Sequence, residues 1–433
     1  MRWVRGFGVL GLIPLYVVSA LSSCLLAAAV VHERFIDLRV YRAGGEIALH
    51  GGDLSRAHFG PLPFTYPPFA TAVLAPLAVP SWLVARIVMT AASVIALPLV
   101  LFLALRLPPA KSWLDRRDAG CLALVAAAAA VWLEPVRTML GLGQVDMLLA
   151  LAVLADLALP ASSRFKGALT GIAAGIKLTP AIFIVYFLIT KRYRAAATAV
   201  IAFAATVAIG FAILPASSAY FWNGTFLNPR RIGSVQSGQN VSLLGAIIRT
   251  LHHTNVSGVW LPVAILLAAF GLTLAARAQR VGDEALGFSA CAITSLLISP
   301  ISWTHHWVLA VPALLLAAVS TYRFRASRKR LATFASAAAI TTAAVIAWSR
   351  PQFARGQGGG HWLHASPSAI VYSELYVVAG LVSLVVAATV VWRRAQAALL
   401  PRWTSHPGLP PPALRPESGV HLTGSSAGLR TRP

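Results

Sequence analysis

Charged residues are scarce in this chain of 433 residues, at 11% of the sequence against about 25% in a typical soluble domain. Acidic residues are the rarest, with 13 Asp and Glu against 36 Lys and Arg, and 58% of the residues are hydrophobic. Uncharged runs of about 17–25 residues, long enough to cross a bilayer as a helix, recur along the chain. The composition excludes a soluble domain and predicts an all-α polytopic membrane protein.

Several signatures of soluble enzymes are also missing. The three cysteines, Cys24, Cys121 and Cys291, lie apart in apolar segments, so no disulfide or thiolate metal site is predicted. The chain has no GxxxxGK[ST], no HExxH, no CxxC and no Asp-x-Asp. Because glycosyltransferases that use soluble nucleotide sugars often hold a metal with Asp-x-Asp, that chemistry has no support. We predict no cofactor and assign no metal ligands, and dependence on a divalent metal stays open.

The net charge of +23 does not indicate nucleic-acid binding, because the Lys and Arg residues form short clusters between the apolar runs. This is the positive-inside pattern, which orients helices in a membrane. It places two long polar gaps, 32–66 and 216–256, outside the cell as external loops. Residues 1–400 then form one transmembrane domain, and 401–433 a disordered, basic, Pro-rich cytoplasmic tail.

Apolar segments predict about 11–12 transmembrane helices. They fall near 7–31, 67–80, 82–105, 119–133, 143–160, 167–190, 195–215, 257–276, 285–300, 303–320, 331–349 and 369–392. The first could pass for a signal peptide, but its length favours a retained helix. A strict count of twelve conflicts with the charge rule in the middle of the chain. The conflict disappears if segment 67–80 enters the membrane only halfway and segment 167–190 consists of two half-helices. The strict count of twelve and this alternative count both stay open.

The first long gap begins with a carboxylate. Asp37 follows the first apolar run in RFIDLRVYRAGGEIAL and leads into a polar, Gly-rich, aromatic loop that ends at Tyr66. An acidic residue within reach of the bilayer is costly and often functional, and loops of this length are often functional too. Asp37 is therefore either a general base facing outward or an interfacial carboxylate paired with Arg34 or Arg39.

Two further stretches place polar groups beside apolar ones. Gln144 and Asp146 stand at the start of an apolar helix, where they either cap it or hold sugar hydroxyls. Lys177 lies inside an uncharged segment, three residues before Pro180, which prevents a regular helix. A lysine that only reached for the interface would sit at a segment's end, so a buried cation for an anionic group such as phosphate is favoured.

The stretch SPISWTHHW places His305 and His306 at a predicted outer boundary. Neighbouring residues on a helix point about 100° apart, so this pair is a poorer chelator than residues at i, i+4. We expect one of the two to face a cavity as a donor to phosphate or a hydroxyl. The alternative is an interfacial anchor made by Trp303 and Trp307.

Together, five stretches resemble the actinobacterial polyprenol-phosphate-mannose-dependent α-(1→2)-mannosyltransferases. They are, in order, DLRVYRAGG, FTYPPFATAVLAPLAVP, GQVDMLLALAVLADL, GIAAGIKLTPAIFIVYFL and LLISPISWTHHWVL. The resemblance implies the glycosyltransferase C fold, a polyprenyl monophosphate mannose donor and a mannosylated lipid or glycan acceptor. It also implies a multi-pass plasma-membrane enzyme whose active site faces the extracytoplasmic side.

The resemblance also suggests residue roles. The family's catalytic aspartate, just after the first helix, maps onto Asp37. Residues assigned to the donor phosphate or sugar are Lys177, His305, His306, Tyr66, Gln144 and Asp146, and those assigned to the acceptor or sugar are Arg42, Gln239 and Asn240. Two positions depart from the family pattern, since Asp146 replaces an expected Asn, and GQNVS stands where Asn-Gln-Ser is expected.

Two alternatives remain beside the mannosyltransferase. A polyprenyl-phosphate-arabinose-dependent arabinofuranosyltransferase of the same fold would differ only in its pocket residues. A lipid or solute transporter belongs to another class, and it would place ionisable residues near the bilayer midplane, often with internal repeats. Here most charges lie at the ends of apolar segments, and Lys177 is the main exception, which favours the enzyme.

Overall fold

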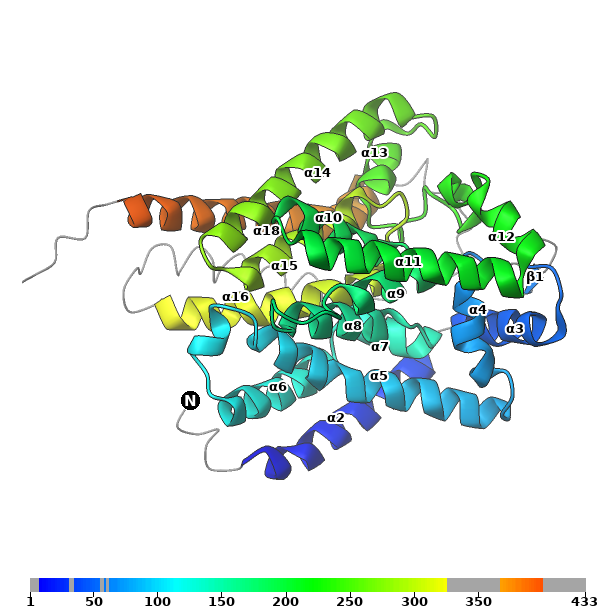
Figure 1. Ribbon diagram of the computed structural model, residues 1–433, viewed down its shortest axis with the longest axis horizontal. Coiled ribbons are helices and arrows are strands. Elements are labelled where there is room, and N and C mark those ends of the chain that lie inside the picture. The colour runs from blue at the N-terminus through cyan, green and yellow to red at the C-terminus, as the bar shows by residue number, and fades with distance from the viewer. Residues whose placement is uncertain (1–7, 31–34, 55–57, 60–61, 325–366, 400–433) are drawn as a thin grey trace, which may run out of the picture.

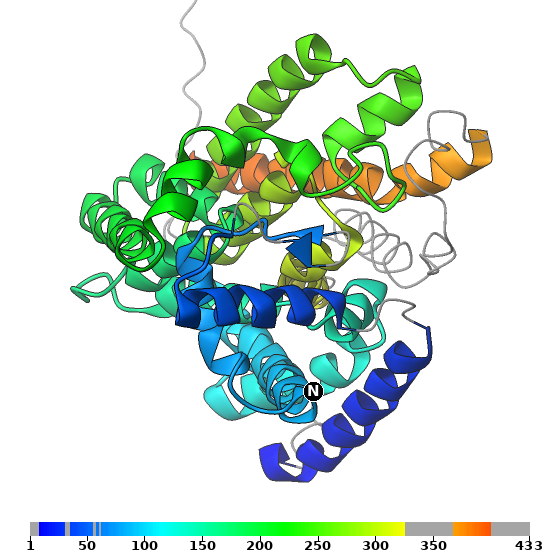
Figure 2. The same ribbon diagram turned by 90° about the vertical axis from the view of Figure 1, so that its right-hand side faces the viewer.

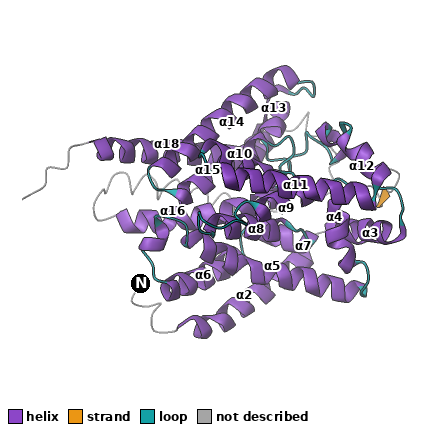
Figure 3. Cartoon of the chain, in the orientation of Figure 1, coloured by secondary structure: helices purple, strands orange, loops and turns teal. Residues whose placement is uncertain are grey.

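The protein is described here by a computed structural model covering residues 8–30, 35–54, 58–59, 62–324 and 367–399. Within these residues the chain is almost entirely helical (Figures 1 and 3). The described strands are β1 (His58–Phe59) and β2 (Leu62–Pro63), an antiparallel pair with Phe59 opposite Leu62. The predicted all-α membrane fold is confirmed.

Six described helices contain spans long and apolar enough to cross a membrane. They belong to α2 (Gly8–Val30), α5 (Trp82–Leu105), α11 (Tyr193–Ile213), α14 (Ser257–Arg280), η6 (Thr304–Ala310) continued by α16 (Val311–Phe324), and α18 (Pro367–Leu399). Large apolar side chains on these helices point outward, with Leu10 82%, Ile201 68% and Leu266 70% exposed. Such apolar surfaces are suited to contact with the lipid of a bilayer.

Six spans are found where about 11–12 transmembrane helices were predicted, because the other apolar segments of the described chain form shorter or broken helices. They are α4 (Phe69–Leu74), η1 (Ala75–Leu77), η2 (Ala110–Ser112), α6 (Arg116–Ala130), α7 (Glu134–Leu142), α8 (Asp146–Ala158), α9 (Ala168–Ile176), η3 (Thr179–Ala181), α10 (Ile182–Ile189) and α15 (Glu284–Ile298). Helices α6 and α7 are bent by 78° and would together make a seventh span. As predicted, 67–80 is too short to cross and 167–190 is broken at Lys177. Segment 331–349 lies outside the described residues.

The first polar gap differs from the predicted loop, because much of it is the helix α3 (Ile36–His50). Its adjacent glycines, Gly44 and Gly45, are poor helix formers and suggest a loop from sequence alone. In the fold they allow close packing instead. A Cβ on Gly45 would lie 2.8 Å from the Cα of Ala75, and one on Gly44 would lie 2.5 Å from the ring of Phe64.

The second polar gap is also partly helical. It contains α12 (Pro215–Trp222), η4 (Thr225–Leu227), η5 (Pro229–Arg231) and α13 (Leu243–Leu251). Ser242 caps α13 by accepting a hydrogen bond from the amide of Gly245, an interaction that satisfies a free donor at a helix start. The gap therefore carries a fixed structure over the neighbouring helices.

Glycines spaced four apart join α9 to α11. A Cβ on Gly167 would lie 2.0 Å from the carbonyl oxygen of Ala195, and a Cβ on Gly171 would lie 2.2 Å from that of Ala199. Small residues at this spacing let membrane helices approach closely. The contact fixes the half-helix α9, and with it the break at Lys177.

The two ends of the bundle differ. Helices α3, α4 and α12 and the hairpin gather at one end, and the C-terminal ends of α16 and α18 lie at the other (Figure 1). Viewed from the first end, α3 lies across it (Figure 2). The predicted cytoplasmic tail, 401–433, lies outside the described residues.

Candidate active site

A cavity of about 630 Å³ opens among segments that are far apart in sequence. Its lining comes from residues 36–40, 62–67, 134–144, 177–182, 221–241, 295–306 and 373–376. Six of the predicted site residues line it: Asp37, Tyr66, Gln144, Lys177, His305 and His306. Gln239 also lines it, from the exposed side of the second polar gap. The fold thus brings most of the predicted site together.

Asp37 lies in the first turn of α3. Phe35, just before the helix, has a left-handed backbone, and its amide donates to the carbonyl of Gly141 at 2.7 Å. This bond ties the start of α3 to the end of α7. An acidic residue in the first turn also suits the positive end of the helix dipole, so a carboxylate is held at the cavity wall.

The predicted alternative for Asp37 was a pair with Arg34 or Arg39. Arg34 lies outside the described residues, and the guanidinium of Arg39 lies 5.3 Å from the ring centre of Trp82. Asp37 lines the cavity, and both the general base and the paired carboxylate stay predictions.

Two tyrosines and an amide form a polar network in the cavity wall. The hydroxyl of Tyr41 donates to Gln144 Oε1 at 2.6 Å, and Gln144 Nε2 donates to the hydroxyl of Tyr66 at 3.1 Å. Burial raises the pKa of the Tyr66 phenol to about 12, although the nearby ammonium of Lys177 lowers it in part. Both phenols therefore stay neutral at physiological pH, and the network orients Gln144.

Lys177 stands at the break between α9 and η3, in an extended conformation. Its Nζ lies 2.6 Å from Asp146 Oδ1 and 5.6 Å from the ring centre of Tyr66. Asp146 opens α8, so its carboxylate also lies at the positive end of a helix. The two residues were predicted separately, and the fold joins them as a buried ion pair.

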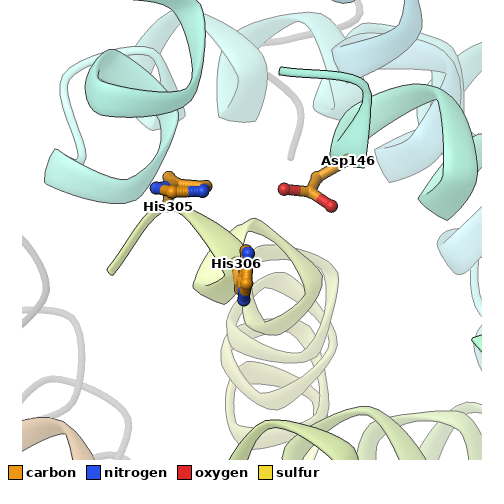
Figure 4. Close-up of side chains that lie close together, drawn as sticks. All are labelled: Asp146, His305 and His306. Atoms are coloured by element: carbon orange, nitrogen blue, oxygen red, sulfur yellow. The ribbon is translucent and has the colours of Figure 1, made fainter. Parts of the chain in front are cut away.

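His305 and His306 both line the cavity, whereas we expected only one of them to face it. Their ring centres are 4.6 Å apart and the ring planes are nearly perpendicular. Asp146 lies opposite them, and one ligand atom from each of the three residues lies within 4.8 Å of the others (Figure 4). The anchoring alternative does not hold for Trp307, which is 1% exposed and packs on Tyr376.

Three predicted site residues, Arg42, Asn240 and Asp146, are not among the residues that line the cavity, although Asp146 pairs with the lining residue Lys177. The guanidinium of Arg42 donates to the carbonyls of Leu77, Ala78 and Pro80. It thereby holds the turn between η1 and α5. The contact of Arg42 with acceptor or sugar stays a prediction, which these backbone contacts do not support.

Asn240 is fully buried and its amide is committed to the protein. Its Nδ2 donates to the carbonyls of Val235 and Pro300, and its Oδ1 accepts from the amide of Ser302. It clamps the second polar gap to the segment that carries the histidines. These bonds hold the wall of the site together, and the contact of Asn240 with acceptor or sugar stays a prediction that they do not support.

One carboxylate in the cavity wall escaped the sequence analysis. Glu134 is buried and accepts hydrogen bonds from the hydroxyls of Thr138, Thr304 and Tyr376. It ties the start of α7 to α18 and to the residue next to His305. The available signal was a lone acidic residue between apolar runs, in VWLEPVR, which is unusual within a membrane domain.

A buried arginine, Arg249, was also not identified from the sequence. Arg249 is fully buried and pairs with Glu374 at 2.7 Å. It also donates to the carbonyls of Ser237 and Asn240. These bonds shape the loop that brings Gln239 to the cavity.

Comparison with known proteins gives a consistent result. A sequence model described as "Glycosyltransferase family 87" matches residues 64–300. Two relatives come from Mycobacterium tuberculosis. One is a polyprenol-phosphate-mannose-dependent alpha-(1-2)-phosphatidylinositol mannoside mannosyltransferase, 32% identical over 67% of this chain and 71% of the relative. The other is the corresponding phosphatidylinositol pentamannoside mannosyltransferase, 36% identical over 65% of each chain.

A third relative, from Mycolicibacterium smegmatis, bears the same phosphatidylinositol mannoside mannosyltransferase name. It is 34% identical over 67% of this chain and 71% of its own length. No solved structure is a significant match.

Proposed function

Because the chain belongs to glycosyltransferase family 87, we propose that it transfers mannose from a polyprenyl monophosphate mannose donor to a mannosylated lipid of the phosphatidylinositol mannoside type, forming an α-(1→2) linkage. The chain is a multi-pass membrane glycosyltransferase. The donor and linkage follow the names of relatives that are 32% and 36% identical. The observation that carries the proposal is the cavity that joins Asp37, Lys177 and the histidine pair.

In the proposed reaction, the acceptor's hydroxyl oxygen attacks the anomeric carbon as the bond to the donor phosphate breaks. Asp37 accepts the hydroxyl proton, and the configuration inverts from β to α. A carboxylate is a weak base for an alcohol. It suffices because the hydroxyl becomes acidic as its oxygen bonds to an oxocarbenium-like carbon, as in inverting glycosidases.

The leaving phosphate needs charge stabilisation more than a proton. The ammonium of Lys177 and a ring nitrogen of His305 or His306 lie in the same cavity and would stabilise it. Such preorganised donors act strongly where water is excluded. Gln144 and Tyr66, oriented by their own hydrogen bonds, would hold sugar hydroxyls, and the exposed Gln239 would meet the acceptor.

We place this site on the extracytoplasmic face of the plasma membrane. The C-terminal ends of α16 and α18 lie at the opposite end of the bundle from α3 and α12 (Figure 1), with Arg323 in the last turn of α16 and Arg393 and Arg394 in the C-terminal half of α18. The positive-inside rule assigns the basic end to the cytoplasm. A lipid-linked donor also suits a compartment without nucleotide sugars.

The test compares the wild-type protein with Asp37→Asn in detergent. Each protein receives synthetic β-mannosyl phosphopolyprenol and a short α-mannoside acceptor, and the product linkage is read by NMR. Glu46→Gln is the matched control, because Glu46 is an exposed carboxylate on the same helix. We expect an α-(1→2) product from the wild type and the control. Asp37→Asn should lose at least ~10²–10⁴ in rate, the usual contribution of a general base.

Near wild-type turnover by Asp37→Asn would remove Asp37 as the base and leave the enzyme class intact. If transfer occurs only from arabinosyl phosphopolyprenol, the donor sugar is a pentose and the assignment of mannose is wrong. Failure of every donor, with gradient-dependent uptake of the lipid in proteoliposomes, would overturn the enzyme in favour of a transporter.

A further inference from the structure

Two of the buried side-chain atoms that have no hydrogen-bond partner in the described part of the chain belong to Asp146 and His305. One is Asp146 Oδ2 and the other is His305 Nε2. Both residues are 6% exposed, so bulk water does not satisfy these atoms. A buried polar atom without a partner costs about 1–3 kcal/mol, and such atoms at a functional site indicate a missing ligand.

The third member of the group is His306. With one ligand atom from Asp146 and one from His305, it completes a set that lies within 4.8 Å (Figure 4). We propose that Asp146, His305 and His306 form a binding site for a divalent transition-metal ion, Mn²⁺ or Zn²⁺. Two imidazoles and one carboxylate suit these ions better than Mg²⁺ or Ca²⁺, which prefer oxygen ligands.

The dimensions fit an ion after a small adjustment. Ligands about 2.1 Å from one ion in tetrahedral geometry lie about 3.4 Å apart, so the side chains must close by up to about 1.4 Å from the observed separation of at most 4.8 Å. Adjacent histidines on a regular helix would point apart, but these open the 3₁₀ segment η6 directly after the extended Trp303. Their rings are nearly perpendicular and 4.6 Å apart, with Asp146 facing both from α8.

The ion pair with Lys177 leaves the required oxygen available. Lys177 contacts Asp146 Oδ1, and the oxygen without a partner is Oδ2. The carboxylate can therefore hold the lysine with one oxygen and the ion with the other. The positive charge of Lys177 already balances the negative charge of Asp146, and neutral imidazoles carry no charge. The positive charge of the ion therefore stays available to bind an anion.

That anion would be the donor's phosphate, a role that rests on the proposed function. Three protein ligands leave open positions on the ion, as in catalytic metal sites. A phosphoryl oxygen in one of them would leave more readily as the bond to the anomeric carbon breaks. The metal site itself needs no assumption about the sugar.

The first experiment measures metal binding without substrate. Purified wild-type protein is stripped with a chelator, titrated with MnCl₂ and followed by the electron paramagnetic resonance signal of free Mn²⁺. ZnCl₂ is tested in parallel by elemental analysis after gel filtration. We expect one ion per chain, with affinity at least tenfold weaker in His305→Gln and in His306→Gln.

A second adjacent histidine pair serves as the control. His252 and His253 are exposed at the end of α13, and the double substitution of both to Gln should bind as the wild type does. Thermal unfolding of each variant without metal shows whether it is folded, and added Mn²⁺ should raise the unfolding temperature only where the site is intact. Wild-type protein that binds no ion, or equal binding in all variants, would overturn the proposal.

The phosphate role has its own readout. With Mn²⁺ bound, the ³¹P resonance of a mannosyl phosphopolyprenol should broaden in the wild type and stay sharp in His306→Gln. Metal binding without mannosyl transfer would support the proposed metal site and overturn the proposed function. Mannosyl transfer at the full rate by chelator-treated protein would support the proposed function and overturn the catalytic role of the ion.

Discussion

Tyr66 is the residue whose protonation state the structure fixes most clearly within the site. Burial raises its pKa to about 12, so the phenol stays neutral at all lower pH values. We expect Tyr66→Phe to lower kcat/KM about tenfold, or about 1.4 kcal/mol, because the hydroxyl bonded to Gln144 is lost. The loss should be the same from pH 6 to pH 10.

The measurement is a pH profile of kcat/KM for both proteins. If a basic limb below pH 10 disappears in Tyr66→Phe, the phenol ionises in the working range and the burial argument fails. Gln144→Leu is the companion variant, because it removes the other half of the hydrogen bond.

At the residue scale, sequence reasoning found the groups that break an apolar pattern. Lys177 stands out in an uncharged segment, and the structure places it in the cavity. Arg42 and Asn240 were assigned through the resemblance to a family, and a motif does not reveal whether a side chain faces a ligand or the backbone. Glu134 was overlooked because two of its three hydroxyl partners, Thr304 and Tyr376, come from distant parts of the chain.

At the element scale, the contact between α9 and α11 depends on glycine. A Cβ at Gly171 would lie 2.2 Å from the carbonyl oxygen of Ala199, a backbone atom that cannot move aside. We expect Gly171→Ala to destabilise the protein by about 1–3 kcal/mol or more. Thermal unfolding in detergent should show this as a lower transition temperature.

Gly258→Ala is the control, since no atom lies within 4 Å of the added Cβ. The change should be neutral or slightly stabilising, because Ala favours the helix. Equal effects of the two substitutions would mean that the close approach of α9 to α11 is not needed for stability.

Elements were predicted well where one strong signal dominates. The break in 167–190 follows from Pro180 and Lys177 and is observed. Helix α3 was missed because its two glycines weaken the local helix signal, while the packing against Ala75 and Phe64 that explains them depends on the tertiary fold.

At the scale of the whole molecule, the proposed orientation in the membrane is testable in cells. Asn223 lies after α12, and Arg117 lies in the first turn of α6; both are exposed. We expect an impermeant maleimide to label Asn223→Cys in intact cells, and Arg117→Cys only after permeabilisation. Cys121 and Cys291 are buried, and Cys24, which is partly exposed, lies in the apolar helix α2, so the wild-type protein serves as the background control. The reverse pattern would place the cavity on the cytoplasmic side.

The class of the whole molecule followed from composition, because scarce charge and long apolar runs leave few alternatives. The ordered motifs added the family, which the match over 64–300 confirms. The assembly of the site from seven distant segments could not be predicted, since contacts between helices depend on which faces pack together.

The ion pair between Lys177 and Asp146 bears on how the chain is synthesised. The ribosome makes Asp146 first, and Lys177 follows 31 residues later. Each charge alone would oppose release into lipid by about 2.5–3.5 kcal/mol at the bilayer centre. We expect the translocon to retain α8 until α9 arrives, so that both segments enter the bilayer together with their charges paired.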